Sequence, residues 1–265
     1  MSGAGLAVER ADGIVTARLE RPDVLNALNA DVLAALDRLL AGLGPDDRVV
    51  VLTGTGTRAF SAGADLDELA GLDAAAAHDI LSAGQAVVAR VEASPVPVIA
   101  AVNGLALGGG FELALACTFM VLADSAELGL PETGLGLVPG YGGTQRLAGR
   151  VGAPVAAFTM LTGERITAER AHALGLTPVP PVHADELPAT AHDLARQIAG
   201  RGPRAVRAAL LALRRGLDAP LDTGLALESA LAGIAVGSAE ATEGVAAFRE
   251  RRKPSFPRPE AGGTS

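Results

Sequence analysis

Two glutamates stand in stretches of the sequence that offer little to solvate a charge. Glu112 follows three consecutive glycines in GLALGGGFELALA, and Glu132 follows Pro131 in LGLPETGLGLVPG. A carboxylate is costly to bury without a partner, and glycine is costly inside a helix or strand. The glycines are expected to open a helix whose first turn carries Glu112. Acids and glycines in this combination suggest a site that does chemistry.

Each feature also has a purely structural explanation when it is taken alone. An acid in the first turn of a helix is stabilised by the helix dipole, which accounts for Glu112. Glu132 can cap the turn or helix that follows it. The glycines can allow a strand to pass close to a helix where a Cβ would not fit.

Taken together, the glycines and the acids predict a defined kind of catalysis. A helix start without side chains presents N–H groups to an oxygen that gains negative charge, and the Gly-rich turn SAGAD can supply a second donor. Two such donors would polarise a thioester carbonyl and stabilise an enolate. One glutamate would then handle a water molecule, and the other a proton on the carbon next to the carbonyl.

The surroundings of the two acids are expected to separate their pKa values. The helix start should favour the ionised form of Glu112, whereas the apolar loop should raise the pKa of Glu132. Coupling between two close carboxyl groups leaves open which of them is the acid and which the base.

Several other classes of site are disfavoured by composition and motifs. A net charge of −8 and 3% aromatic residues argue against a nucleic-acid partner. The segment 104–110 lacks the dinucleotide fingerprint, and TGTGTRAFSAG lacks the Gly-Lys-Ser/Thr of a phosphate loop. Ser61 is preceded by Ala59 where a nucleophile elbow needs glycine. No metal site is predicted, because no ligand spacing links the four histidines, His78, His172, His183 and His192.

The sequence also carries features that bear on the compartment. A single cysteine, Cys117, excludes an internal disulfide. The first residues, MSGAGLAVERADG, show no signal-peptide pattern. Apolar runs such as 113–123 are shorter than the roughly 20 residues that span a bilayer. A cytoplasmic protein without a membrane partner is therefore expected.

The hydrophobic pattern predicts a layered α/β core. Residues 6–20 should form a hairpin around Asp12 and Gly13, and Asn29 should cap a helix. Strands are expected at RVVVLTG, VPVIAAV and FMVLAD, with helices at 74–91 and after the triple glycine. Helical patterns dominate beyond about residue 185. The tail, PSFPRPEAGGTS, is expected to fray or to lie over a neighbour.

These segments resemble the enoyl-CoA hydratase/isomerase family, also called the crotonase family. AFSAGADLDEL, PVIAAVNGLALGGGFELALAC, LGLPETGLGLVPGYGGTQRL and LTGERITAERAHALGL carry the resemblance in the family's order, and RPDVLNALN and FRERRKPSF extend it over nearly the whole chain. The resemblance implies an α/β spiral of ββα-type units with the acyl-CoA site in residues 1–200. It also implies a C-terminal helical oligomerisation region in residues 201–265, and a homotrimer or a homohexamer made of two trimers.

The resemblance further implies roles for individual residues. The N–H groups of Ala64 and Gly109 would form the oxyanion hole, and Gly140 would make a backbone contact near the catalytic water. Coenzyme A would enter as part of the substrate, with no separate cofactor. The residues expected to contact the acyl-CoA are Arg58, Ala62, Ala64, Asp65, Leu66, Asp67, Gly109, Tyr141, Phe248, Arg251 and Phe256.

Three positions depart from the family's pattern. Thr118 stands where the family usually has Asp, which puts a structural hydrogen bond in doubt. Asp23 and Asp67 replace residues that are often basic, so CoA phosphates would be held less by charge, or by other arginines.

The separation of the two acids, 132 − 112 = 20, is the hydratase spacing of this family. It implies a lyase that adds water reversibly and syn to a trans-2-enoyl-CoA, giving a 3-hydroxyacyl-CoA. Glu112 would activate the water, and Glu132 would exchange the α-proton. Two alternatives remain open: an isomerase or dehydratase of a specialised acyl-CoA, and a non-catalytic acyl-CoA-binding protein. Acyl-chain length and pathway are left open, with Phe111, Tyr141 and the segment after Asp67 expected to wall the acyl group.

Overall fold

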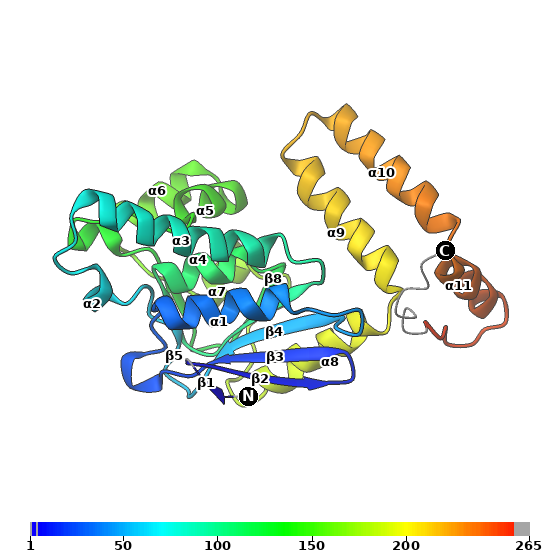
Figure 1. The fold of residues 1–265 in the computed structure, drawn as a ribbon, viewed down its shortest axis with the longest axis horizontal. Coiled ribbons are helices and arrows are strands. Elements are labelled where there is room, and N and C mark those ends of the chain that lie inside the picture. Colours follow the sequence, from blue (N-terminus) through cyan, green and yellow to red (C-terminus); the bar gives the residue numbers. More distant parts are fainter. Residues whose placement is uncertain (1, 4, 257–265) are drawn as a thin grey trace.

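The computed structural model describes residues 2–3 and 5–256 of the 265 in the chain. They form a six-stranded sheet and a four-stranded sheet with helices packed around them (Figure 1). The prediction for the tail concerns mainly residues 257–265, which lie outside the described part.

The six-stranded sheet begins with the predicted hairpin. Its two strands pair antiparallel around Asp12 and Gly13, whose φ angles of 52° and 78° suit a tight turn. The pairs β3–β4, β4–β6 and β6–β8 are parallel. In spatial order the strands are β1 (Ser2–Gly3), β2 (Leu6–Ala11), β3 (Ile14–Leu19), β4 (Val49–Gly54), β6 (Val98–Val102) and β8 (Phe119–Leu122).

A second sheet carries the glycine-rich turns. Its strands lie in the order β10 (Ile166–Thr167), β9 (Glu127–Gly129), β7 (Leu105–Leu107) and β5 (Ala59–Ser61). This sheet was not predicted, because strands of two or three residues are too short to show an alternating pattern. Parallel pairing of β5 with β7 brings the SAGAD turn beside the triple glycine.

Helices cover both faces of the six-stranded sheet, and β4 shows how the sequence achieves this. Val50 and Leu52 belong to the apolar layer shared with α1 (Ala30–Ala41) and α3 (Ala74–Glu92). Val49 and Val51 face the opposite layer, which contains residues of α8 (Leu187–Ala199). Successive strand residues point to opposite faces, so a fully apolar strand is expected between two helical layers. Figure 1 shows α1 and α3 on one side and α8 on the other.

The helix that follows the triple glycine is the most deeply placed element of the site. Every residue of α4 (Gly109–Ala116) is buried, and α3 and α5 (Gly143–Val151) pack against it. The predicted cap of α1 is also present, since the side chain of Asn29 accepts a hydrogen bond of 3.0 Å from the Val32 N–H. The remaining helices of the body are α2 (Leu66–Leu69), α6 (Ala153–Thr162) and α7 (Ala168–Ala173), with short 3₁₀ helices at Pro22–Val24 (η1) and Glu132–Leu135 (η2).

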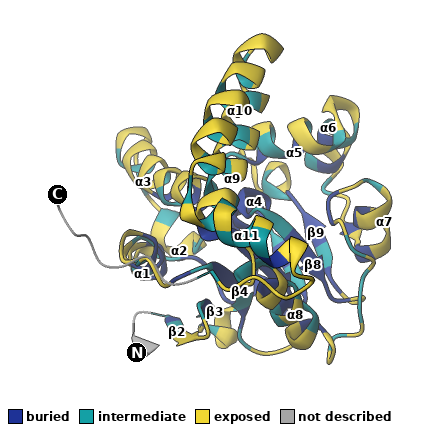
Figure 2. Ribbon diagram, turned by 90° about the vertical axis from the view of Figure 1, so that its right-hand side faces the viewer, coloured by how far each residue is buried: buried dark blue, intermediate teal, exposed yellow. Residues whose placement is uncertain are grey.

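The C-terminal helices follow this body and touch it through Arg214, which donates to the Ser94 carbonyl at 2.6 Å and to the Thr118 hydroxyl at 3.3 Å. Helices α9 (Pro203–Leu217) and α10 (Leu221–Val236) lie against each other and project away from the sheets, and α11 (Ala239–Arg249) follows at the far end (Figure 1). Much of α10 is exposed, as Figure 2 shows, although its sequence is rich in leucine and alanine. The division at residue 200 stays a prediction. In the described part of the chain, no helix has both the length and the apolar character needed to cross a bilayer.

Candidate active site

Two backbone N–H groups converge where the turn after β5 meets the start of α4. A Cβ on Gly109 would lie 3.2 Å from the Ala64 nitrogen, and one on Gly63 would lie 3.3 Å from the Gly109 nitrogen. Gly63 also has a φ of 110°, which L side chains rarely adopt. Within the residues that the structure describes, neither the Ala64 nor the Gly109 N–H donates a hydrogen bond. Both donors are therefore available to the same small group.

The turn that carries Ala64 is held by the segment 21–28. The Leu28 N–H donates to the Gly63 carbonyl at 2.8 Å, and the Asp65 N–H donates to the Leu28 carbonyl at 2.9 Å. Arg21 forms an ion pair of 2.8 Å with Asp65. These contacts on both sides of Ala64 fix the direction of its N–H.

Glu112 is enclosed by a second turn. Glu112 is only 1% exposed. Its Oε1 accepts hydrogen bonds from the N–H groups of Tyr141 at 2.8 Å and Gly143 at 2.6 Å. A Cβ on Gly143 would lie 2.9 Å from Cγ of Glu112, so a bare glycine is needed there. The carboxyl group is thus fixed in one orientation.

The prediction that the helix start favours the ionised form of Glu112 is wrong in direction. Burial raises the pKa of this carboxyl, while the N–H groups of Gly143 and Tyr141 and the charge of Arg146 oppose the rise. The sequence shows the position in the helix but not the depth of burial, which dominates here.

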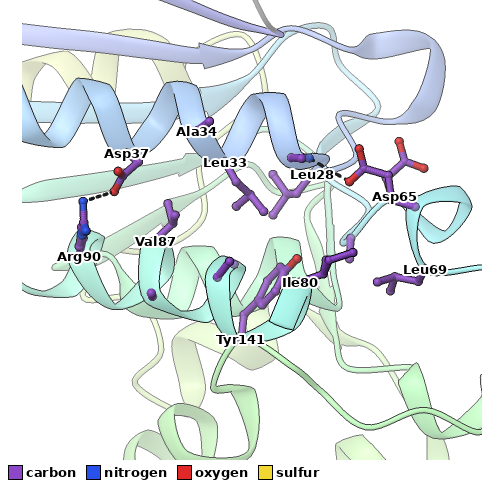
Figure 3. Close-up of a pocket in the computed structure, with 16 residues that line it drawn as sticks. Leu28, Leu33, Ala34, Asp37, Asp65, Leu69, Ile80, Val87, Arg90 and Tyr141 are labelled. Carbon is purple, nitrogen blue, oxygen red and sulfur yellow. Dashed lines mark hydrogen bonds and ion pairs between the residues drawn. The ribbon is translucent and has the colours of Figure 1, made fainter. Parts of the chain in front are cut away.

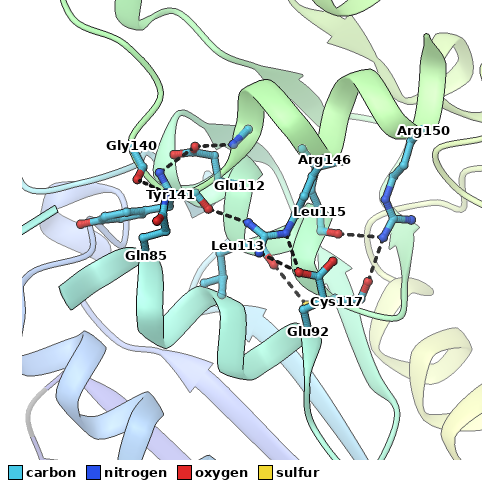
Figure 4. A network of polar contacts seen from close by, with 11 residues as sticks. Gln85, Glu92, Glu112, Leu113, Leu115, Cys117, Gly140, Tyr141, Arg146 and Arg150 are labelled. Atoms are coloured by element: carbon cyan, nitrogen blue, oxygen red, sulfur yellow. Dashed lines mark hydrogen bonds and ion pairs between the residues drawn. The ribbon is translucent and has the colours of Figure 1, made fainter. Parts of the chain in front are cut away.

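A polar network holds the turn that binds Glu112, and Figure 4 shows it. Arg146 on α5 donates to the Tyr141 carbonyl at 2.6 Å, and it donates twice to one carboxylate oxygen of Glu92 on α3, at 3.0 and 2.7 Å. Gln85 donates to the Gly140 carbonyl at 3.3 Å. Neither Arg146 nor Glu92 was predicted from the sequence, where a lone arginine in GGTQRL was the only signal.

Glu132 lies in different surroundings, at the first residue of η2. Its Oε1 is 3.0 Å from the place a Cβ on Gly108 would occupy, which puts the carboxyl group beside the glycines that open α4. Its Oε2 is buried and has no hydrogen-bond partner among the described residues. Burial raises the pKa of Glu132 to about 7, and the charge of Glu112 contributes. The direction of this shift is the one predicted for Glu132 from the sequence.

A cavity of about 450 Å³ lies next to the Ala64 turn, between α1 and α3 (Figure 3). Most of its wall is apolar, and Tyr141 closes one side of it. Its volume falls in the range of small-molecule sites, which are typically roughly 300–1,000 Å³. An ion pair of Arg90 with Asp37 lies at its far end.

The other predicted substrate contacts fall into two groups. Arg58, Ala62, Leu66 and Asp67 lie in β5, in α2 or directly beside them, close in sequence to Ala64. Phe248, Arg251 and Phe256 lie in α11 or just after it, at the end of the molecule opposite α2 (Figure 1). Phe248 is 85% exposed. A single protomer therefore does not bring the second group to the acids.

The departures from the family's pattern have simple structural outcomes. The Thr118 hydroxyl accepts a hydrogen bond of 3.0 Å from the Val98 N–H, so this side chain does have a structural partner. Arg214 donates to the same hydroxyl at 3.3 Å. Asp23 and Asp67 are exposed.

In the described part of the chain, no three His, Cys, Asp or Glu side chains gather as they would around a metal ion. The absence of a metal from the site stays a prediction.

Known proteins similar to this chain identify its family and its fold. The profile of the family described as enoyl-CoA hydratase/isomerase matches residues 9–259. The chain belongs to this family. An enoyl-CoA hydratase of Bacillus anthracis, known from a crystal structure, superposes with a TM-score of 0.92 at 40% identity, covering 95% of this chain and 98% of that one. The predicted crotonase fold is thereby confirmed.

Two curated relatives of the enoyl-CoA hydratase/isomerase family illustrate its range of substrates. The 2,3-dehydroadipyl-CoA hydratase of Escherichia coli is 41% identical, with 95% of this chain and 98% of the relative covered. The short-chain-enoyl-CoA hydratase of Clostridium acetobutylicum is 38% identical, with 93% and 95% covered. Both are hydro-lyases, the enzyme class predicted from the sequence.

Proposed function

We propose that the protein is an enoyl-CoA hydratase, which adds water reversibly and syn to a trans-2-enoyl-CoA to give a 3-hydroxyacyl-CoA. The observation that carries this proposal is the pair of acids beside two unpaired N–H donors. One acid is fixed by two backbone hydrogen bonds, and the other has a free buried oxygen and a pKa of about 7. An acid and a base of this kind are what hydration of a conjugated thioester requires.

In the proposed reaction the thioester oxygen accepts hydrogen bonds from the N–H groups of Ala64 and Gly109. Negative charge grows on this oxygen as water adds to the β-carbon, and preorganised donors stabilise the resulting enolate. The loss of one such donor typically costs about 3–4 kcal/mol of transition-state stabilisation. The hydrogen bonds and the ion pair between segment 21–28 and the Ala64 turn keep the Ala64 N–H in place before the substrate binds.

The two glutamates divide the proton transfers. Glu112 accepts a proton from the water whose oxygen bonds to the β-carbon, and protonated Glu132 delivers a proton to the α-carbon. One proton is gained and one is lost, so exchange with solvent restores both acids. The Gly140 turn lies beside the attacking water. Coenzyme A takes part as a portion of the substrate, without a further cofactor.

Binding of the CoA portion is proposed to involve more than one copy of the chain. The turn around Asp65, Leu66 and Asp67 would receive the adenosine, with Arg58 near the phosphates. Phe248, Arg251 and Phe256 would approach the site of a neighbouring protomer, since they lie far from their own. Exposed leucines on α9 and α10, such as Leu217 at 78% and Leu221 at 77%, give such a neighbour an apolar surface to cover. Light scattering should give the mass of a homotrimer or homohexamer.

The direct test is to add the purified protein to crotonyl-CoA and to follow the loss of the conjugated thioester absorbance. Hydration without added metal or cofactor is expected. Turnover of a 3-enoyl thioester with none of crotonyl-CoA would instead assign an isomerase. Tight CoA binding in calorimetry without turnover of any thioester would assign a binding protein.

A further inference from the structure

Three arginines line a small pocket where the C-terminal helices join the body. Arg48 directly precedes β4, Arg201 follows α8, and Arg207 lies on α9. Pro97, the residue before β6, and Ile198 of α8 form part of the same wall. Strands β4 and β6 begin at this edge, and the chain leaves their other ends toward the glycine-rich turns. The pocket and the candidate active site therefore lie at opposite ends of these strands.

Two of the three guanidinium groups have a buried nitrogen that binds nothing. Nη1 of Arg48 and Nε of Arg207 are both buried, and neither has a hydrogen-bond partner among the described residues. A guanidinium group carries donors only, so another arginine cannot satisfy it. A buried donor without an acceptor is costly, and more so when it belongs to a charged group. The pocket therefore lacks an acceptor, and negative charge on that acceptor would be favourable.

The acids nearest to the pocket already have other partners. Among the described residues that line it, Asp47 alone is acidic; it pairs with Arg10 at 3.4 Å and accepts a hydrogen bond of 2.9 Å from the Gly44 N–H. Glu240, on α11, does not line the pocket, and its two oxygens accept from the Arg204 N–H at 3.2 and 3.0 Å. The lining thus carries three positive charges and one negative charge, which attracts anions.

The size of the pocket limits what it can hold. Its volume is about 10 Å³, close to the roughly 10–15 Å³ that one water molecule needs. Val96, Pro97, Ile198 and Val206 contribute its apolar wall. A polyatomic anion such as phosphate does not fit into this space, and a water molecule would satisfy a donor without balancing the charge. A monatomic anion meets both requirements.

We propose that this pocket is a binding site for one monatomic anion, chloride or another halide, which accepts hydrogen bonds from Arg48 and Arg207. The bound anion joins the start of β4 to α9, next to the segment where Arg214 of α9 donates to the Ser94 carbonyl at 2.6 Å. It thereby stabilises the attachment of the C-terminal helices to the body. Without it, the guanidinium groups repel one another across the junction. The site makes no contact with the acids and is independent of the proposed hydratase function.

The test is the melting temperature of the full chain in increasing sodium chloride, with sodium gluconate at the same ionic strength as the reference. A ligand that binds the folded state should raise the melting temperature of the wild type by roughly 3 °C for each tenfold rise in chloride above its Kd. Arg48→Gln and Arg207→Gln should lose this gain. Arg215→Gln is the matched control, because Arg215 is exposed on the same helix and does not line the pocket, and it should keep the gain.

A second measurement locates the anion and does not depend on the folding of a variant. Crystals of the wild type soaked in sodium bromide should show an anomalous peak between Arg48 and Arg207. Equal melting temperatures in chloride and gluconate, or a gain that persists in Arg48→Gln and Arg207→Gln, would overturn the inference. A pocket without a bromide peak, or a larger gain from phosphate than from chloride that depends on these arginines, would also overturn it.

Discussion

The two acids of the site have opposite surroundings. Glu112 is in a helix of which every residue is buried, and two N–H groups hold its carboxylate while the charge of Arg146 favours its ionised form. Glu132 begins a short 3₁₀ helix whose next residues are exposed, and one of its oxygens is buried without a partner in the described chain. The difference suggests a fixed base beside an acid whose proton is free to leave, which is the division of roles that hydration needs.

The largest effect is expected when either acid loses its ability to transfer a proton. Glu112→Gln keeps a carbonyl oxygen for the two N–H donors, and Glu132→Gln keeps the shape of its side chain. Each should lower kcat on crotonyl-CoA by about 10²- to 10⁴-fold, the usual range for general acid–base catalysis. Glu127→Gln is the matched control, because the Glu127 side chain forms an ion pair with Arg165 at the surface, and kcat should be unchanged. Activity retained in either of the first two variants would remove that acid from the mechanism.

A smaller effect is expected from crowding Glu112 without removing it. In Gly143→Ala the new Cβ would lie 2.9 Å from Cγ of Glu112, whereas in Gly134→Ala, two residues after Glu132, nothing lies within 4 Å of the new Cβ. Overpacking typically costs about 1–3 kcal/mol, so Gly143→Ala should lower both the melting temperature and kcat. Gly134→Ala should lower neither. Equal behaviour of the two variants in calorimetry and in the crotonyl-CoA assay would show that Glu112 is not tightly held.

Loss of Arg146 should loosen the turn at Tyr141 that binds Glu112, and it should leave the surroundings of Glu132 unchanged. Its positive charge opposes the rise in the pKa of Glu112, so Arg146→Gln should raise that pKa and move the acidic limb of the pH–rate profile to higher pH. We expect a kcat loss of roughly tenfold, equivalent to about 1.4 kcal/mol. Arg165→Gln, which breaks a surface ion pair, should leave the profile in place. A lower kcat with an unshifted profile would assign Arg146 a purely structural role.

The smallest expected effect is on the free energy of unfolding, and its pH dependence reports the ionisation of Glu132. Because its pKa is raised from 4.5 to about 7 in the folded protein, its contribution to stability is present below pH 4.5 and is lost as the pH rises through about 7. Glu132→Gln does not titrate, so it should be more stable than the wild type at pH 8, by about 1–2 kcal/mol after allowance for partial exposure. Urea denaturation at pH 5 and pH 8 measures this. A difference that does not depend on pH would contradict the raised pKa.

The sequence predicted the parts of this site that depend on local pattern. The Asp12 turn, the Asn29 cap and the helix after the triple glycine follow from residue types within a few positions, and the structure confirms them. The raised pKa of Glu132 also followed from its apolar loop. The short strands of the second sheet carry too few residues to show a period, so they were missed.

Long-range features of the site were beyond local reasoning. The pairing of Arg146 with Glu92 joins residues on different helices, and no local pattern marks it. The burial that raises the pKa of Glu112 comes from packing of α3 and α5 on α4. The position of Glu112 at a helix start could be predicted from nearby residues, and it suggested a lowered pKa. Burial by the surrounding helices raises the pKa instead.

The central claim is that this pair of acids adds water across the double bond of an enoyl thioester, and isotope incorporation tests it most directly. Crotonyl-CoA would be incubated with the protein in ¹⁸O-labelled heavy water, and the product would be analysed by mass spectrometry. The account predicts one ¹⁸O on the β-carbon and one deuterium on the α-carbon, with neither label incorporated at a comparable rate by Glu112→Gln or Glu132→Gln. Deuterium on the α-carbon without ¹⁸O, or full labelling by either variant, would contradict it.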